Sequence, residues 1–485
     1  VFVSHNLGSH ELSIYLDYKA KGCKMKYIST RGVAPALSFE EAMLTGLALD
    51  GGLYVPAHIP KLTKEDILSL QGRRYQDIAF RIIKPFVGDA FEDDALIDII
   101  EKAYADFSHV SCAPLVELEA NHFLLELFHG PTLAFKDFAM QLIGQLFQVA
   151  LKRREKQVTI IGATSGDTGS AAIEAFRGLD AVNVFILFPD GRVSDVQRRQ
   201  MTTAKESNVH AIAVDGTFDD CQSRVKDMFN DHEFRNEVQL AGINSINWAR
   251  VLAQIVYYFS SAVSLGAPFR KVSFTVPTGN FGDIFAGYIA KEMGLPIERL
   301  VVATNQNDIL HRCLSGKGYH TTQVAASISP SMDIQISSNF ERALFYAYGL
   351  DTTEIVKLME QLKQNDGFEI TNDALNALSE HYSSGMATEV ETSDTIKTIL
   401  TRSAQLLCPH TAIGVKVADD LRDNKVPMVT LATAHPAKFP AAVKNASEVN
   451  PKLPNRMSDL FDRPERISKV DNDLVQLKNL IRDRI

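Results

Sequence analysis

With 485 residues, of which 45% are hydrophobic and 22% charged, the chain has the composition of a folded globular protein and not of a disordered one. Its length exceeds what one simple hydrophobic core usually holds, so two or three lobes are expected. The formal net charge of -9 and the lack of a basic cluster argue against nucleic-acid binding. No apolar run is long enough to cross a membrane, and the five cysteines form no Cys-x-x-Cys pair, which favours a reducing cytoplasm and no metal site.

The opening segment, residues 1–24, lacks the basic start and apolar core of a secretion signal. Met25 could be an alternative start, with the preceding residues as a poorly ordered extension. Residues 25–110 are mostly helical in pattern and predict an N-terminal lobe. Ser38 and Glu41 match a capping box at the start of a helix, which the "DGG" sequence at Asp50–Gly52 is expected to end.

Residues 111–440 alternate short apolar runs with helical stretches. Because the runs are hydrophobic almost throughout, they predict an α/β fold with parallel sheets covered by helices in two lobes. A very apolar stretch from Val251 is expected to be a buried helix. The expected strands begin at Val158, Val182, Val209, Val272, Leu300 and Val426.

Strand signals are absent from about residue 340 to residue 407, which predicts a helical insertion. Its segment "DTTEIVKLMEQLKQND" places Ile355, Leu358, Met359 and Leu362 on one helix face. Residues 441–485 are expected to form a helical tail that closes with an amphipathic helix.

One lysine stands in unusual surroundings, because "FHGPTLAFKDFAM" places Lys136 after Phe135 and before Asp137 and Phe138. Many lysines extend their methylenes along apolar surface and keep the charge in water. Alternatively, burial lowers the pKa of a lysine, and its amine can then form a Schiff base with a carbonyl. The phenylalanines would then shield the Lys136 amine from water, whereas the charge of Asp137 would oppose the loss of the proton from Lys136.

Two glycine-rich turns each follow a predicted strand and open a helix: "TSGDTG" at Thr164–Gly169 and "GNFGD" at residues 279–283. Backbone N–H groups at a helix N-terminus attract anions, and ligands of open α/β sheets bind where the strands end. Both turns are therefore candidate anion sites. The first is neither a Walker A loop nor a dinucleotide fingerprint, and a tight turn that merely needs glycine is the alternative.

A third strand end, in "VTLATAHPAKFP", presents Thr433 and His435. A hydroxyl at such a position can reach the ring nitrogen of a heteroaromatic cofactor. His435 fits a packed, hydrogen-bonded histidine better than a catalyst.

Together, "GPTLAFKDF", "SGDTG", "GNFGD" and "ATAHPAKF" resemble the threonine synthase family. The segment "KYISTRGVAPALSFEEAMLTGLALDGGLYVP" is similar to the opening of its longer, bacterial and fungal form, so the resemblance covers about Met25 to Ala442. The wider group is the pyridoxal-phosphate enzymes of fold type II, the tryptophan-synthase-β-like fold. The resemblance implies a cytoplasmic lyase that converts O-phospho-L-homoserine and water to L-threonine and phosphate, the last step of threonine biosynthesis.

The resemblance also implies roles for particular residues. Lys136 would be the catalytic residue and would bind pyridoxal 5'-phosphate as a Schiff base, while Thr433 would hydrogen-bond the pyridine nitrogen. The residues expected at the cofactor phosphate are Gly279, Asn280, Phe281 and Asp283. Those expected at the substrate α-carboxylate are Thr164, Ser165, Gly166, Asp167 and Thr168. Many relatives carry asparagine at the position of Asp167, whose carboxylate would repel the cofactor's phenolic oxygen unless it were protonated or paired.

The substrate's own phosphate needs a second anion site. Candidates in "SSNFER" are Ser337, Ser338, Asn339 and Arg342, because arginine suits bidentate phosphate binding; a solvated helix face is the alternative for Arg342. We expect a monomer or homodimer that binds a small-molecule substrate. Two rival functions remain: another fold type II lyase, such as a serine/threonine dehydratase or a phospholyase, and a phosphate- or nucleotide-binding module without chemistry.

Overall fold

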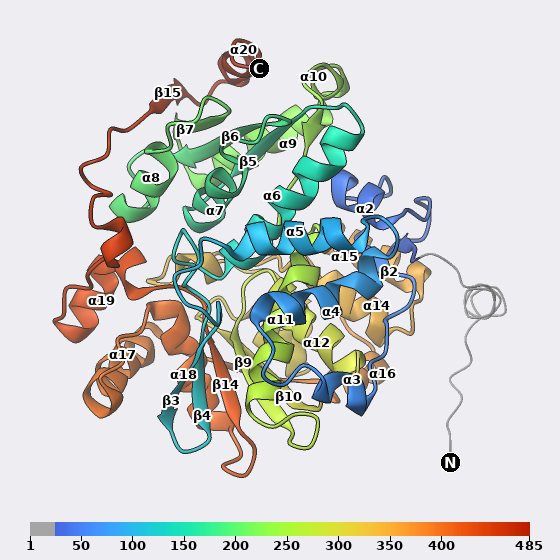
Figure 1. Cartoon of the computed structure of the whole chain (residues 1–485), viewed down its shortest axis with the longest axis vertical. Coiled ribbons are helices and arrows are strands. Elements are labelled where there is room, and N and C mark those ends of the chain that lie inside the picture. Colours follow the sequence, from blue (N-terminus) through green and yellow to red (C-terminus); the bar gives the residue numbers. More distant parts are fainter. Residues whose placement is uncertain (1–24) are drawn as a thin grey trace.

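The structure is a computed structural model that describes residues 25–485 (Figure 1). The expected extension before Met25 lies outside the described residues. The helices of the described part are α2 (Phe39–Thr45), α3 (Lys64–Leu68), α4 (Tyr75–Val87), α5 (Asp93–Tyr104), α6 (Lys136–Arg153), α7 (Asp167–Phe176), α8 (Asp195–Thr202), α9 (Phe218–Asn230), α10 (His232–Glu237), α11 (Trp248–Ser264), α12 (Gly282–Glu292), α13 (Ile309–Leu314), α14 (Phe340–Ala347), α15 (Thr352–Asn365), α16 (Asn372–Ser379), α17 (Glu389–Ser403), α18 (Pro409–Leu421), α19 (Pro440–Ser447) and α20 (Leu474–Arg482).

The N-terminal lobe is mostly helical, as predicted, with one short antiparallel pair of β1 (Tyr27–Ser29) and β2 (Tyr54–Pro56). The predicted capping box at Ser38 and Glu41 is present at the start of α2. The prediction that "DGG" ends this helix is wrong, because α2 ends at Thr45 and Gly46 follows it with a φ of 73°. Glycine adopts this left-handed conformation without steric cost, so the helix stops there.

Two sheets form the framework of the rest of the chain (Figure 1). The six-stranded sheet, in the lower part of the view, has the order β13-β10-β9-β14-β4-β3, and all its neighbours are parallel except the β3–β4 hairpin. Its strands are β3 (Leu115–Glu119), β4 (His122–Glu126), β9 (Val272–Pro277), β10 (Ile297–Thr304), β13 (Tyr382–Met386) and β14 (Met428–Ala432).

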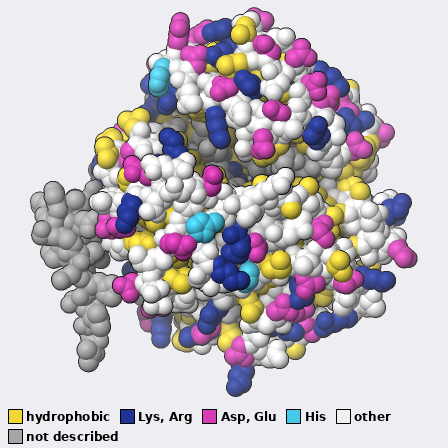
Figure 2. Space-filling model, turned by 180° about the vertical axis from the view of Figure 1, so that it is seen from behind, with side chains coloured by type: hydrophobic (Ala, Val, Ile, Leu, Met, Phe, Trp, Pro, Cys, Tyr) yellow, Lys and Arg dark blue, Asp and Glu magenta, His cyan; other side chains and the backbone are white. Residues whose placement is uncertain are grey.

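The five-stranded sheet, in the upper part, is parallel throughout and has the order β15-β7-β6-β5-β8. Its strands are β5 (Val158–Ala163), β6 (Val182–Pro189), β7 (Val209–Asp215), β8 (Leu240–Ala241) and β15 (Ile467–Asp471). A separate antiparallel pair joins β11 (Tyr319–His320) to β12 (Gly367–Phe368). Seen from behind, the surface is hollowed between the upper and lower parts, with Lys and Arg side chains at the rim (Figure 2).

All predicted strands are present, and the expected buried helix is α11, whose residues are almost all inaccessible to solvent. Two predictions about strands are wrong. The insertion is not purely helical, because β12 and β13 lie within it, and the tail contains β15. The strands β13 and β15 carry few apolar residues, "YSSGM" and "ISKVD", because each lies at the edge of its sheet and needs less burial. Among residues 25–485, no helix combines the length and apolar character that a bilayer crossing requires.

Candidate active site

Lys136 is the first residue of α6 and lies where β4 and β14 end. The loop that leads to it is hydrogen-bonded to the end of β14, because the Leu127 N–H donates to Ala432 O at 3.0 Å and the Phe135 N–H donates to Thr433 O at 2.9 Å. These bonds bring Lys136 beside Thr433, although the two residues are far apart in the sequence. Both residues line the same cavity.

The Lys136 ammonium is not a surface group, since its side chain is only 12% exposed. Its Nζ lies 4.9 Å from the centre of the Phe135 ring. Phe138, by contrast, packs among aromatic rings of the core that include Tyr75 and Phe107, so only Phe135 of the two phenylalanines lines the cavity. Burial lowers the pKa of Lys136, and the nearby Asp167 carboxylate opposes that shift.

Asp137 directs its carboxylate to the loop before it. The carboxylate accepts hydrogen bonds from the Thr132 N–H at 2.8 Å and from the Thr132 hydroxyl at 2.6 Å. A Cβ atom at Gly130 would lie 2.5 Å from the Asp137 Cβ, so this close approach requires glycine. Burial raises the pKa of Asp137, against the effect of the Thr132 hydrogen bonds. Asp137 therefore holds the loop that positions Lys136.

The "TSGDTG" turn connects β5 to α7. The Thr164 hydroxyl oxygen accepts hydrogen bonds from the N–H groups of Gly166 and Gly169, both at 2.9 Å. Gly166 has a φ of 133°, and a Cβ there would lie 2.3 Å from the Gln197 side chain. Thr164 thus braces the turn, Gly166 and the half-buried Ser165 shape it, and Asp167 and Thr168 face the cavity.

The "GNFGD" turn connects β9 to α12. Phe281 has a φ of 62°, and a Cβ at Gly279 would lie 2.7 Å from Ser331 O, so the turn is tightly held. The first backbone bond of α12 runs from Phe285 N to Phe281 O, which leaves the preceding N–H groups at the helix N-terminus for a ligand. Gly279, Asn280, Phe281 and Asp283 all line the cavity.

Asp283 lies in the first turn of α12 and is buried. The Tyr258 hydroxyl donates to its Oδ1 at 3.2 Å, and the Tyr257 hydroxyl donates to the same oxygen. Among the described residues, Asp283 Oδ2 has no hydrogen-bond partner. Burial raises the pKa of Asp283 to about 7, against the effect of the two tyrosines, so a neutral carboxyl group is populated near neutral pH.

The structure does not bring the "SSNFER" segment to the cavity wall, and Ser337 and Asn339 instead support the second turn from behind. The Ser337 hydroxyl donates to Gly279 O at 2.7 Å, and Asn339 Nδ2 donates to Asn280 O at 2.9 Å. The Ser338 hydroxyl lies 3.4 Å from the Asn280 side-chain oxygen.

Arg342 lies farther from the cavity than these residues, in the interior of the protein. Its side chain is fully buried, so the alternative of a solvated helix face is wrong. The guanidinium donates to Tyr54 O at 2.8 Å and to Ile246 O at 2.7 Å, and a further bond runs to Asn339 Oδ1. Burial lowers the pKa of Arg342 to about 9. Its donors therefore join the N-terminal lobe to the loop before α11.

Thr433 lines the cavity, whereas His435 does not. His435 Nδ1 accepts a hydrogen bond from the Ala437 N–H at 3.1 Å, and burial lowers the pKa of His435 to about 4. It is the packed histidine that the sequence favoured. The polar residues that line the cavity are Lys136, Asp167, Thr168, Ser245, Arg250, Gln254, Thr278, Asn280, Asp283, Ser331, His410 and Thr433.

Arg250 and His410 were not identified from the sequence. Arg250 is 5% exposed, and its Nη1 has no hydrogen-bond partner within residues 25–485. Burial lowers the pKa of Arg250 to about 10, which leaves it charged at neutral pH. The sequence feature that could have identified Arg250 is its place as a lone arginine at the start of a helix that is otherwise apolar and buried.

His410 Nε2 accepts a hydrogen bond from the Ser331 N–H at 3.2 Å, which assigns its proton to Nδ1. Among residues 25–485, Nδ1 has no hydrogen-bond partner. Burial lowers the pKa of His410 to about 4, so the ring is neutral at neutral pH. His410 therefore brings a neutral N–H donor to a cavity that also contains Arg250.

Comparisons with known proteins cover most of the chain. Residues 26–104 match "Threonine synthase N terminus", residues 107–401 match "Pyridoxal-phosphate dependent enzyme", and residues 411–481 match "Threonine synthase, C-terminal". The threonine synthase of Pseudomonas aeruginosa is 50% identical, over 94% of this chain and 98% of that protein. The threonine synthase of Saccharomyces cerevisiae is 44% identical, over 95% of this chain and 98% of that protein.

Solved structures agree with the sequence relatives. The crystal structure of pyridoxal-phosphate-bound threonine synthase from Brucella melitensis is 54% identical and superposes with a TM-score of 0.94, covering 95% of this chain and 99% of that chain. For the yeast threonine synthase structure the identity is 41% and the TM-score 0.90, over 95% and 98% of the two chains. The chain therefore belongs to the threonine synthase family of pyridoxal-phosphate-dependent enzymes of fold type II.

Proposed function

We propose that the protein converts O-phospho-L-homoserine and water to L-threonine and phosphate. The family supports a threonine synthase, and one observation about the site supports this substrate. A single cavity contains a largely buried lysine together with two separate features that attract anions, the N-terminus of α12 and the Arg250 guanidinium. A phosphorylated cofactor and a phosphorylated substrate together require two such features.

The residues present fit pyridoxal phosphate. The turn at residues 279–282 supplies N–H groups at a helix N-terminus that have no backbone acceptor among residues 25–485, and Lys136 supplies an amine whose pKa is lowered by burial. We assign the cofactor phosphate to Gly279, Asn280 and Phe281, with Asp283 beside them, and the ring nitrogen to the Thr433 hydroxyl. When bound, pyridoxal phosphate supplies an electron-withdrawing ring that stabilises negative charge at the substrate α-carbon.

The substrate phosphate is assigned to Arg250. Its Nη1 is buried and lacks a partner among residues 25–485, and a buried charged donor of this kind is strongly stabilised by an anion. Ser245 lines the same cavity and can add a hydroxyl. Thr168, together with the turn formed by Thr164, Ser165 and Gly166, is assigned to the α-carboxylate.

Lys136 also has a role in proton transfer. Because burial lowers the pKa of Lys136, its amine loses its proton more readily than that of an exposed lysine and can accept the proton that the substrate α-carbon loses. The leaving phosphate departs from the γ-carbon, and the hydroxyl of water ends on the β-carbon. Arg250 can hold the departing phosphate through its charged donors.

The experiment that tests this function starts from the purified protein with pyridoxal phosphate. Borohydride should attach the cofactor permanently to Lys136, and peptide mass spectrometry should find the adduct there and not in the Lys136→Ala variant. Loss of this general base should lower kcat by about 100- to 10,000-fold. Incubation with phosphohomoserine should yield threonine; if 2-oxobutyrate were the only product, the protein would be a different lyase.

We also propose a cytoplasmic location and a monomer or homodimer. The four described cysteines are all free and buried, which fits a reducing compartment.

A further inference from the structure

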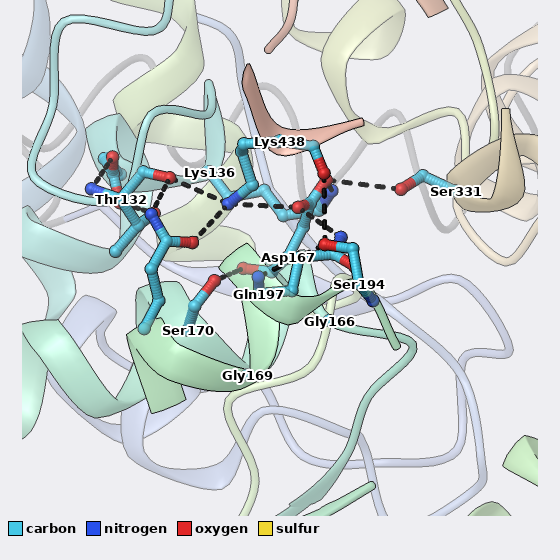
Figure 3. Close-up of polar contacts among 12 residues, drawn as sticks. Thr132, Lys136, Gly166, Asp167, Gly169, Ser170, Ser194, Gln197, Ser331 and Lys438 are labelled. Carbon is cyan, nitrogen blue, oxygen red and sulfur yellow. Dashed lines mark hydrogen bonds and ion pairs between the residues drawn. The ribbon is translucent and has the colours of Figure 1, made fainter. Parts of the chain in front are cut away.

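Asp167 lies between two lysines (Figure 3). Its Oδ2 is 3.5 Å from Lys136 Nζ, and its Oδ1 is 3.1 Å from Lys438 Nζ. Each carboxylate oxygen also has a neutral donor: Gln197 Nε2 is 2.9 Å from Oδ1, and the Ser331 hydroxyl is 3.4 Å from Oδ2. The side chains of Asp167 and Lys438 are 4% and 0% exposed, so water contributes little to this pairing.

Lys438 is held in place on the side away from Lys136. It belongs to the short 3-10 turn η2 (Pro436–Lys438), and its Nζ donates to Thr132 O at 2.7 Å and to Gln200 Oε1 at 2.9 Å. Together with the ion pair to Asp167, these two hydrogen bonds fix the position of the ammonium group. The backbone is held as well, since the Ser194 hydroxyl donates to Lys438 O at 3.1 Å. Lys438 is therefore a permanent partner of Asp167, whereas Lys136 is the lysine that must react.

The charges of Lys136, Asp167 and Lys438 indicate what Lys438 does at the site. Burial alone would raise the pKa of Asp167, but Lys438 and then Lys136 outweigh burial and hold that pKa well below its usual range. If Lys136 were the sole cation beside this carboxylate, loss of its proton would leave a buried charge without a partner, which is unfavourable. The proton would then stay on Lys136, and the amine could not attack a carbonyl.

We propose that Lys438 is a positioning residue that holds the Asp167 carboxylate through its own ion pair, so that Lys136 can lose its proton without leaving Asp167 unpaired. The inference rests on the proposed function, because that function gives Lys136 its reactive role. It also explains how this chain accommodates a carboxylate that is almost fully buried beside the reactive lysine. The buried charge that aspartate adds is matched by the buried charge of Lys438.

The groups that influence Lys136 come from several elements. Asp167 of α7 raises its pKa, whereas Arg250 of α11 and Lys438 of η2 lower it. Asp283 of α12 and His410 of α18 also respond to the charge of Lys136. A test must therefore separate the direct repulsion between the two lysines from the effect that Lys438 exerts through Asp167.

The test measures the protonation of Lys136 in the cofactor-free protein. Acetic anhydride labels neutral amines. Peptide mass spectrometry of samples labelled across a pH series therefore gives the half-point for Lys136, the pH at which its labelling rate is half of the maximum. In Lys438→Met the half-point should rise by about one pH unit or more, equivalent to roughly tenfold slower labelling at neutral pH. In the Asp167→Asn background the same substitution should move it by less than about half a unit, because no carboxylate remains to retain the proton.

Lys416→Met is the matched control, since Lys416 pairs with Asp420 at 2.5 Å on the surface of α18 and should leave the half-point unchanged. A folded Lys438→Met protein with an unchanged half-point, or an equal shift in both backgrounds, would overturn the proposal. If Lys438→Met did not fold, recovery of folding in Asp167→Asn/Lys438→Met would support it, and failure of both would overturn it. No substrate is used, so a negative threonine assay would reject the proposed function without altering this result.

Discussion

At the scale of single residues, Arg250 is the side chain through which the proposed substrate can be tested most directly. We expect Arg250→Met to lower kcat/KM for phosphohomoserine by about 10- to 100-fold, because a hydrogen bond to a charged group contributes about 1.5–3 kcal/mol. Most of the loss should appear as a higher KM, and Arg250→Lys should recover part of it. The measurement is steady-state phosphate release over a range of substrate concentrations.

The same variants distinguish the two phosphates. If Arg250 binds the substrate phosphate, the affinity for pyridoxal phosphate, measured from the visible absorbance, should change little. A large loss of cofactor affinity with an unchanged KM would instead assign Arg250 to the cofactor phosphate.

Asp283 gives a prediction about pH and stability. Its pKa is raised from 3.8 to about 7 by burial, so the folded protein binds more protons than the unfolded chain between these values. The contribution of Asp283 to the free energy of unfolding is therefore greatest below about pH 4 and is lost as the pH rises toward 7. Asp283→Asn removes this titration but keeps an oxygen that can accept from Tyr257.

We expect the stability of Asp283→Asn relative to the unsubstituted protein to improve by about 2 kcal/mol between pH 5 and pH 7, measured by urea unfolding without cofactor. The exposed Asp462→Asn is the control and should show no such trend. If the difference in free energy of unfolding between Asp283→Asn and the unsubstituted protein did not change with pH, the raised pKa of the Asp283 carboxyl group would be contradicted.

At the scale of elements, α14 stabilises the site without entering it. Arg342 joins Tyr54 O of β2 to Ile246 O before α11, so its loss would leave buried carbonyl groups without donors. We expect Arg342→Met to lower the free energy of unfolding by about 3 kcal/mol or more. Arg482→Met is the control, because Arg482 pairs with Glu237 at the surface, where solvent screening leaves an ion pair with little effect on stability. Equal losses in the two variants, measured by urea unfolding, would contradict this role.

The elements also show what the sequence could predict. The apolar runs from Val158 and Val272 predicted strands, because both faces of a parallel strand are buried. The glycine turns that follow them predicted that the ligand site lies at the ends of these two strands. The edge strand β13 was missed because "YSSGM" has no such run.

Contacts between distant parts of the chain could not be predicted in this way. Arg342 carries no local sign that its partner Tyr54 lies 288 positions earlier, and its charge suggested an anion site instead. Lys438 likewise lies in a recognised motif, yet its pairing with Asp167 depends on how the loop after β14 folds against α8. Local patterns specify elements and turns, whereas the partner of a buried charge is specified only by the whole fold.

At the scale of the whole molecule, the cavity is shared by the two sheets. Lys136, Gly279 and Thr433 follow strands of the six-stranded sheet, whereas Asp167 follows β5 of the five-stranded sheet. A ligand that contacts both groups should therefore suppress local openings on either side, because such openings would destroy its binding site.

We expect pyridoxal phosphate at about 100 times its Kd to slow amide hydrogen exchange by up to about 100-fold, or about 2.7 kcal/mol, where exchange requires the site to open. Protection should appear together in the first turn of α7 and in residues 278–282, as measured by hydrogen-exchange mass spectrometry. Helix α20, at the far edge of the five-stranded sheet, is the internal control and should exchange at an unchanged rate. Protection of residues 278–282 without α7 would show that the cofactor is held by the six-stranded sheet alone.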